Sequence, residues 1–174
     1  LMREFLPTVR AVGTLFVPAE VNMVVNRELL VREGKKAGVE VTAVAVSTSS
    51  EVSDAALAMV SQDIDAVCQI SGNLTAASFG GISQAARKAK LPVFAFQKSQ
   101  AHAGAAVTLA RDYYDAGNAA ALMAVRILRG ESPARIPIQS FTKTTLMINR
   151  AAARSVGLNI PQSVMKRNPE MIGN

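Results

Sequence analysis

Side-chain amides, hydroxyls and a glycine are concentrated in four short stretches of the sequence, at residues 18–23, 47–50, 71–74 and 96–98. The residues concerned are Asn22, Ser47, Thr48, Ser71, Gly72, Asn73 and Gln97. Amides and hydroxyls donate and accept hydrogen bonds without carrying a charge. Each stretch precedes, or could precede, a predicted helix, and a helix N-terminus favours an anionic group. This chemistry suits a small polar ligand that carries a carboxylate.

Helix capping is the alternative explanation for some of the same residues. Asn22, Thr48 and Asn73 stand where a helix N-cap is expected, and an N-cap needs no ligand. Thr48 is followed three residues later by Glu51, which is the spacing of a capping box. Because one side chain can cap a helix and also contact a ligand, both interpretations stay open.

Catalytic and metal-binding patterns are missing from the sequence. It has no GxGxxG, GxxxxGK(S/T) or GxSxG motif and only one histidine. Cys68 lies in an apolar segment, where a buried inert thiol is expected rather than a nucleophile. His102 stands alone, which favours a solvent-facing or locally hydrogen-bonded side chain over a metal ligand. We therefore expect no enzymatic activity, no cofactor and no metal site.

Composition narrows the class of protein further. The chain has 174 residues, of which 49% are hydrophobic, and a formal net charge of +6. This length predicts about one domain with a substantial core. The single cysteine excludes a disulfide scaffold, and no apolar run approaches the roughly 20 residues of a membrane helix. Most basic residues flank predicted helix C-termini without interleaved aromatic side chains, which argues against a nucleic-acid partner.

Short β-branched segments alternate with helical patterns in the first part of the chain. Strands are predicted at residues 12–17, 39–46, 66–70 and 93–96, and helices at residues 22–37, 52–60 and 74–89. This alternation predicts a mostly parallel sheet covered on both faces, in a doubly wound, three-layer α/β/α fold. Ligands of such sheets bind outside the carboxyl ends of the strands, where the four polar stretches lie.

The pattern changes after residue 97. A strand is predicted at residues 105–109, a helix at 113–129, a strand at 143–148 and a short helix at 150–156. One face of the helix at 113–129 carries Ala120, Ala124, Ile127 and Leu128. From residue 161 the sequence is polar, basic and without period, so a loosely held end is expected.

Several motifs follow one another along nearly the whole chain. They are Leu6-Pro7, Pro18-x-Glu20-x-Asn22, the serine-rich turn and helix at residues 47–59, Asp65-Ala66-Val67, Gly72-Asn73, Pro92-Val93-Phe94, Gly104-Ala105, Asp112-Tyr113-Tyr114-x-x-Gly117, and the closing stretches at residues 127–133 and 157–161. In this order the chain resembles the ABC-transporter substrate-binding proteins of the tryptophan/tyrosine type, which have the type I periplasmic-binding-protein fold.

The resemblance implies the C-terminal lobe of a two-lobed protein, with the N-terminal lobe upstream and absent. Residues 1–104 would form the α/β core of this lobe. Residues 105–135 would form a crossover whose helix packs on the other lobe, residues 136–160 a return strand and short helix, and residues 161–174 a polar tail. The ligand-binding residues expected on this basis are Asn22, Met23, Ser47, Thr48, Ser71, Gly72, Asn73 and Gln97.

Three of these positions depart from the family's pattern. The family usually has a small hydroxyl residue where Met23 stands, often has Asp where Gly72 stands, and has another acidic residue near Gln97. The loss of two acidic groups reduces the expectation of an ion pair with a ligand amino group. The fold and the transport class are therefore implied more strongly than the identity of the ligand.

The function implied by the resemblance is capture of a small solute, such as an amino acid or related carboxylate, by hinge closure between two lobes. The partner would be an ABC permease, and the protein would be a periplasmic or extracellular lipoprotein whose signal sequence is not in this chain. Without the other lobe, we expect self-association or exchange of the helix at 113–129. An effector-binding domain of a transcription regulator or sensor, and a flavodoxin-like enzyme, stay open as alternatives.

Overall fold

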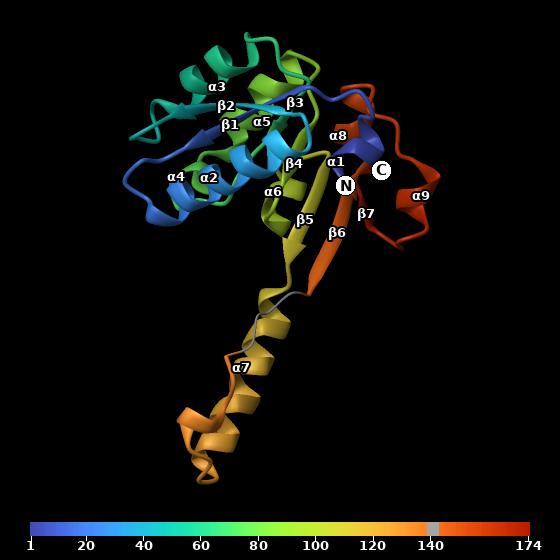
Figure 1. The fold of residues 1–174 in the computed structure, drawn as a ribbon. Helices are drawn as coiled ribbons and strands as arrows, with labels where there is room; N and C mark the ends of the chain where they lie inside the picture. Colours follow the sequence, from blue (N-terminus) through green and yellow to red (C-terminus); the bar gives the residue numbers. More distant parts are fainter. Residues whose placement is uncertain (139–142) are drawn as a thin grey trace.

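A computed structural model describes residues 1–138 and 143–174. Within these residues it has a seven-stranded sheet in the order β2-β1-β3-β4-β5-β6-β7 (Figure 1). The strands are β1 (Ala11–Phe16), β2 (Glu40–Ala45), β3 (Ala66–Cys68), β4 (Val93–Ala95), β5 (Val107–Arg111), β6 (Thr144–Asn149) and β7 (Glu170–Ile172). Neighbouring strands run parallel except β5 and β6, which are antiparallel. The prediction of a mostly parallel α/β sheet is confirmed.

The helices connect these strands and cover both faces of the sheet. They are α1 (Met2–Phe5), α2 (Val21–Lys36), α3 (Val52–Val60), α4 (Asn73–Ala77), α5 (Phe79–Lys88), α6 (Lys98–His102), α7 (Tyr113–Leu128), the 3-10 helix η1 (Pro133–Arg135), α8 (Arg150–Ser155) and α9 (Gln162–Met165). None of the helices in the described ranges is long and apolar enough to cross a membrane.

Alternation along the strands divides the core into two apolar clusters, because successive side chains of a strand point to opposite faces. Val67 belongs to one cluster, together with Met59 of α3 and Phe79 of α5. Its neighbour Cys68 belongs to the other, with Phe5 of α1. The predicted three-layer arrangement is confirmed.

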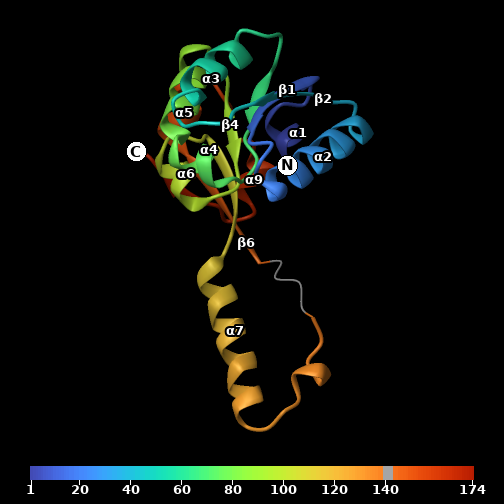
Figure 2. The same cartoon turned by 90° about the vertical axis from the view of Figure 1, so that its left-hand side faces the viewer.

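One part of the chain leaves this packed body. Strands β5 and β6 run out side by side, and α7 with η1 projects beyond them (Figures 1 and 2). We call residues 113–138 the arm, and the other described residues the body. No residue of α7 is buried. Residues 139–142, which belong to the expected return segment at 136–160, lie outside the described residues.

Two expectations about the elements were wrong. The helix expected at residues 74–89 is interrupted at Ser78 and forms two helices, α4 and α5. The end of the chain, expected to be loosely held, contains α9 and β7, and β7 pairs with β6. Val164 of α9 is fully buried. Burial of scattered apolar side chains therefore keeps this segment packed on the sheet, although its sequence lacks the hydrophobic periodicity of a helix or strand.

Candidate functional site

The loops after β1, β3 and β4 meet at Ser71. These three strands are neighbours in a parallel sheet, so their carboxyl ends lie at one edge. Gln97 Nε2 donates to Ser71 Oγ at 2.8 Å, and Asn22 Nδ2 donates to the Ser71 carbonyl at 3.4 Å. The structure thus brings together three of the residues expected from the sequence, and we call this edge the candidate site.

The N-terminus of α4, which follows β3, is satisfied by a carboxylate from another loop. Glu20 Oε2 accepts a hydrogen bond from Asn73 N at 2.8 Å, and Glu20 Oε1 accepts one from Leu74 N at 3.1 Å. The expectation that these N–H groups await an anionic ligand is therefore wrong. The quoted Pro-x-Glu-x-Asn motif contained this residue, but Glu20 was not recognised as a partner of the loop at 71–74.

Asn22 and Asn73 do not cap the helices for which they were considered. The N-cap of α2 is Glu20, and that of α4 is Gly72, so each asparagine lies inside the first turn. Both asparagines are exposed. The capping interpretation is wrong for these two residues, and their side-chain amides remain accessible at the edge of the sheet.

Met23 and Gly72 pack against each other below the surface. Met23 is fully buried, and Gly72 is buried as well. A Cβ atom at Gly72 would lie 1.9 Å from Met23 Sδ. The backbone of Gly72 is extended, at φ −158° and ψ 157°, so space rather than conformation requires the glycine. The burial of this pair corrects the expectation that both residues face a ligand.

Ser47 and Thr48 follow the edge strand β2 and form hydrogen bonds only with their own turn among the described residues. Ser47 N donates to Glu51 Oε2 at 2.8 Å, and the hydroxyls of Thr48 and Ser50 are 2.9 Å apart. The Ser47 N–H holds the pKa of the Glu51 carboxyl below its usual range. The expected capping box is absent from α3, whose N-cap side chain makes no capping hydrogen bond.

Two glutamines that the sequence analysis did not single out shape the candidate site. Gln69 is fully buried, and its side chain accepts from Leu15 N at 3.1 Å and donates to the Leu15 carbonyl at 3.0 Å. It therefore extends the β1–β3 pairing beyond the point where the backbone ladder stops. Gln100 forms a capping box with Gln97 at the start of α6. The Gln-x-x-Gln spacing of residues 97 and 100 could have predicted the role of Gln100 from the sequence.

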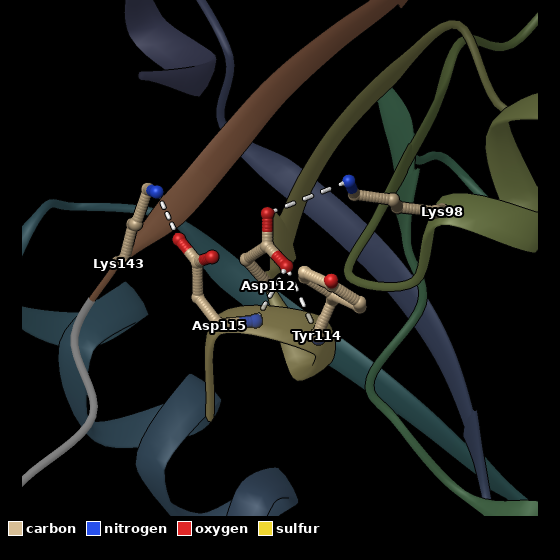
Figure 3. A network of polar contacts seen from close by, with 5 residues as sticks. All are labelled: Lys98, Asp112, Tyr114, Asp115 and Lys143. Carbon is tan, nitrogen blue, oxygen red and sulfur yellow. Dashed lines mark hydrogen bonds and ion pairs between the residues drawn. The ribbon is translucent and has the colours of Figure 1, made fainter. Parts of the chain in front are cut away.

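A network of charged groups lies where β5 passes into the arm (Figure 3). Asp112 Oδ1 accepts from Tyr114 N at 3.1 Å and Asp115 N at 3.2 Å, so Asp112 is the N-cap of α7. Lys98 Nζ lies 3.7 Å from Asp112 Oδ2, and Lys143 forms an ion pair with Asp115. The Asp115 N–H and then Lys98 hold the pKa of the Asp112 carboxyl below its ordinary value.

The structure gives Cys68 no features of a nucleophile. Its thiol is buried in β3, and burial raises the pKa of Cys68 to about 12. A thiol with this pKa is almost wholly protonated at neutral pH, whereas nucleophilic attack requires the thiolate. Within the described ranges, no cluster of three or more His, Cys, Asp and Glu side chains could hold a metal ion.

Comparison with known proteins gives a consistent assignment. Residues 1–172 match the family described as ABC transporter substrate binding protein. The tyrosine-binding protein of Clostridioides difficile is 28% identical over 158 residues, which are 91% of this chain and 46% of that protein. The chain therefore spans about half the length of this curated relative.

Two solved structures are also similar over nearly the whole chain. A conserved domain protein from Vibrio cholerae has a TM-score of 0.88 and 31% identity, covering 98% of this chain and 57% of that one. The ABC domain in complex with L-Trp from Streptococcus pneumonia has a TM-score of 0.86 and 27% identity, covering 99% and 59%. The family is one of substrate-binding proteins rather than enzymes, as the missing catalytic motifs indicated. The chain belongs to the ABC transporter substrate-binding proteins.

Proposed function

We propose that this chain forms one wall of a ligand cleft that captures an aromatic amino acid, or a related carboxylate, for an ABC importer. The observation that carries the proposal is the convergence of Asn22, Ser71 and Gln97 at the carboxyl edge of the sheet, with Asn73 exposed beside them. Uncharged donors and acceptors at such an edge can orient a small polar ligand without chemical change. The tyrosine-binding relative and the L-Trp complex support an aromatic side chain.

We propose further that the ligand is enclosed by hinge closure against a second lobe. The antiparallel strands β5 and β6 carry the chain out of the body and back, which is the arrangement of a two-stranded hinge. The arm beyond them has exposed apolar side chains, including Leu122 and Leu128 at 69% and 86% exposure. Packing of the arm on another lobe would cover them. When the 174-residue chain is studied alone, a second copy of the chain would cover these side chains instead.

The proposed cellular role follows from the importer class. The complete protein would work at an ABC permease, outside the cytoplasmic membrane, in the periplasm or as an extracellular lipoprotein. The match over residues 1–172 favours this role over an effector domain of a transcription regulator.

Calorimetry on the complete protein tests the proposed ligand class. L-Trp and L-Tyr should bind, with Kd values at or below the micromolar range, and Asn73→Ala should weaken the better ligand by about tenfold, the free energy of one hydrogen bond. The matched control is Asn159→Ala, because Asn159 is exposed outside the candidate site. Unchanged affinity in Asn73→Ala would remove Asn73 from the site, and absence of binding to both amino acids would refute the proposed ligand.

A further inference from the structure

Two hollows adjoin each other at the end of β5, beside the candidate site. The larger has a volume of about 480 Å³, and its lining includes Leu29, Ile70, Ser71, Phe96, Arg111 and Tyr113. The smaller has a volume of about 320 Å³ and lies at the start of α6, where Gln97 and Lys98 line it. Arg111 and Tyr113 line both hollows. The Arg111 side chain therefore lies between the polar loops of the site and a mostly apolar groove, which Asn26 and Glu33 also line.

Arg111 differs from the other cations of this region in lacking a carboxylate partner. Lys98 pairs with Asp112, and Lys143 pairs with Asp115 (Figure 3). Among residues 1–138 and 143–174, Arg111 forms no ion pair. The sequence at residues 139–142 contains no Asp or Glu. A guanidinium beside an apolar groove is thus left without a counterion from this chain.

The carboxylates around the site are already engaged. Glu20 accepts from the first N–H groups of α4, and Asp112 accepts from those of α7. Glu33, which lines the larger hollow, pairs with Lys36 at 2.9 Å. A ligand ammonium group would therefore have to compete with an existing partner for each of these oxygens. A ligand carboxylate would meet an unengaged guanidinium.

We propose that Arg111 anchors the ligand by its carboxylate, and that this wall of the cleft selects a carboxylate next to an apolar group rather than an ammonium group. Guanidinium binds a carboxylate through two parallel hydrogen bonds, which fixes both the position and the orientation of the anion. The apolar groove of Leu29, Ile70 and Phe96 would then receive the hydrocarbon part of the ligand. This inference rests on the proposed function, because it assumes that the ligand binds at this edge of the sheet.

Three related ligands separate the contributions of the two charged groups in the complete protein. L-Trp has both groups, indole-3-propionate lacks the ammonium group, and tryptamine lacks the carboxylate. By calorimetry, indole-3-propionate should bind within about tenfold of L-Trp. Tryptamine should bind at least about tenfold more weakly than indole-3-propionate, because it cannot form the charge-assisted hydrogen bonds to Arg111.

Variants of Arg111 test whether this side chain causes the preference for indole-3-propionate over tryptamine. Arg111→Gln should weaken indole-3-propionate by about 10- to 100-fold and abolish its advantage over tryptamine, whereas Arg111→Lys should keep part of both. Arg87→Gln is the matched control, because it removes the same charge from α5, outside both hollows. Equal affinities in Arg111→Gln and the unchanged protein, or tighter binding of tryptamine than of indole-3-propionate, would overturn the inference.

A failure of the proposed function is distinguishable from a failure of this inference. If neither L-Trp nor L-Tyr binds, the aromatic amino acids are refuted as ligands. The carboxylate preference is then tested by thermal shift, with a panel of aliphatic and aromatic carboxylates and their amine counterparts. Stabilisation by carboxylates that is lost in Arg111→Gln would support the inference. If no carboxylate in the panel stabilises the protein, whether or not amines do, the inference is overturned.

Discussion

The body and the arm of this chain contain similar apolar side chains, but these are buried in the body and exposed in the arm. In the body, Leu15, Met59 and Ile82 are fully buried against both neighbouring helices and strands. In the arm, α7 has 16 residues and none is buried. Leu122, Val125 and Leu128 are all exposed. A sheet gives each apolar side chain a surface on which to pack, whereas a single projecting helix gives it only its own turns.

The comparison shows what holds each region in place. The body is stabilised by removal of apolar surface from water, which is a tertiary effect. The arm depends on a few polar interactions: the Asp112 cap, the ion pair of Asp115 with Lys143 of the body, and the ion pair of Arg126 with Glu131. Exposed ion pairs contribute little each, and an isolated helix of this length is marginal in water. The arm is therefore the part of the chain that most needs a partner.

Thiol labelling should give the largest difference between the two regions. Cys68 is buried and its pKa is raised to about 12, whereas a cysteine introduced by Leu128→Cys would replace a side chain that is 86% exposed. At neutral pH and low protein concentration, we expect Cys68 to react at least about a thousandfold more slowly, because thiolate is the reactive form. Mass spectrometry after iodoacetamide treatment measures both rates. Comparable rates would show that the body opens readily.

Gln69 tests how much a fully buried polar contact contributes to the stability of the body. In Gln69→Leu, the buried Leu15 N–H loses its acceptor and the Ile70 carbonyl loses its donor, while the Leu15 carbonyl keeps only the long contact from Thr14 Oγ1 at 3.5 Å. Unsatisfied buried groups cost about 1–3 kcal/mol each, so two of them should lower the free energy of unfolding by about 2–6 kcal/mol. Urea unfolding measures the loss. Gln84→Leu, at an exposed position of α5, should change stability by no more than about 0.5 kcal/mol.

The arm should show the opposite behaviour when an apolar side chain is replaced. Leu122→Glu removes an exposed side chain, so the free energy of unfolding measured in dilute solution should change by no more than about 0.5 kcal/mol. Self-association of the 174-residue chain should weaken by about tenfold or more, since a charge would enter the proposed contact. Light scattering over a wide concentration range measures it. A chain that stays monomeric throughout would refute the proposed association.

Asp112 should give the smallest effect, confined to the start of the arm. Asp112→Ala removes the acceptor for Tyr114 N and Asp115 N, so hydrogen-exchange protection in the first turn of α7 should fall while that of the body stays unchanged. Asp54→Ala, in the first turn of α3, is the control because the Asp54 side chain makes no hydrogen bond within the described residues.

The same carboxylate predicts a pH dependence with a definite sign. The pKa of Asp112 is lowered in the folded chain, so its stabilising contribution is present above the unfolded value of about 3.9 and is lost as pH falls through the lower folded value. Protection of the first turn of α7 should therefore decrease below about pH 4, and this decrease should be absent in Asp112→Ala. A loss of protection centred above pH 5 would implicate another group.

Much of the fold was predictable because it depends on local periodicity. The strand at residues 39–46 and the helix at residues 113–129 were placed within two residues of their observed ends. The cap at Asp112 was not among the caps considered from the sequence, although Asp112 directly precedes the helical pattern. The division at Ser78 and the strand β7 were not predictable in this way, because each depends on packing against elements that are distant in sequence.

The candidate site was predictable only in outline. The polar loops were found because carboxyl ends of parallel strands share one edge, and Asn22, Ser71 and Gln97 do meet there. The roles of Glu20 and Gln69 were missed, since each acts on a backbone group about 54 residues away. No local pattern reports a contact over such a separation.

The sequence by itself determined the alternation of strands and helices and the family, because these depend on residue type, spacing and order along the chain. Only the tertiary structure decided which polar groups remain accessible. Glu20 occupies the N–H groups of α4, Met23 fills the space above Gly72, and Arg111 has no carboxylate partner among the described residues. Each outcome depends on which atoms approach within a few ångströms after folding, and hydrogen bonds and ion pairs form only at such distances.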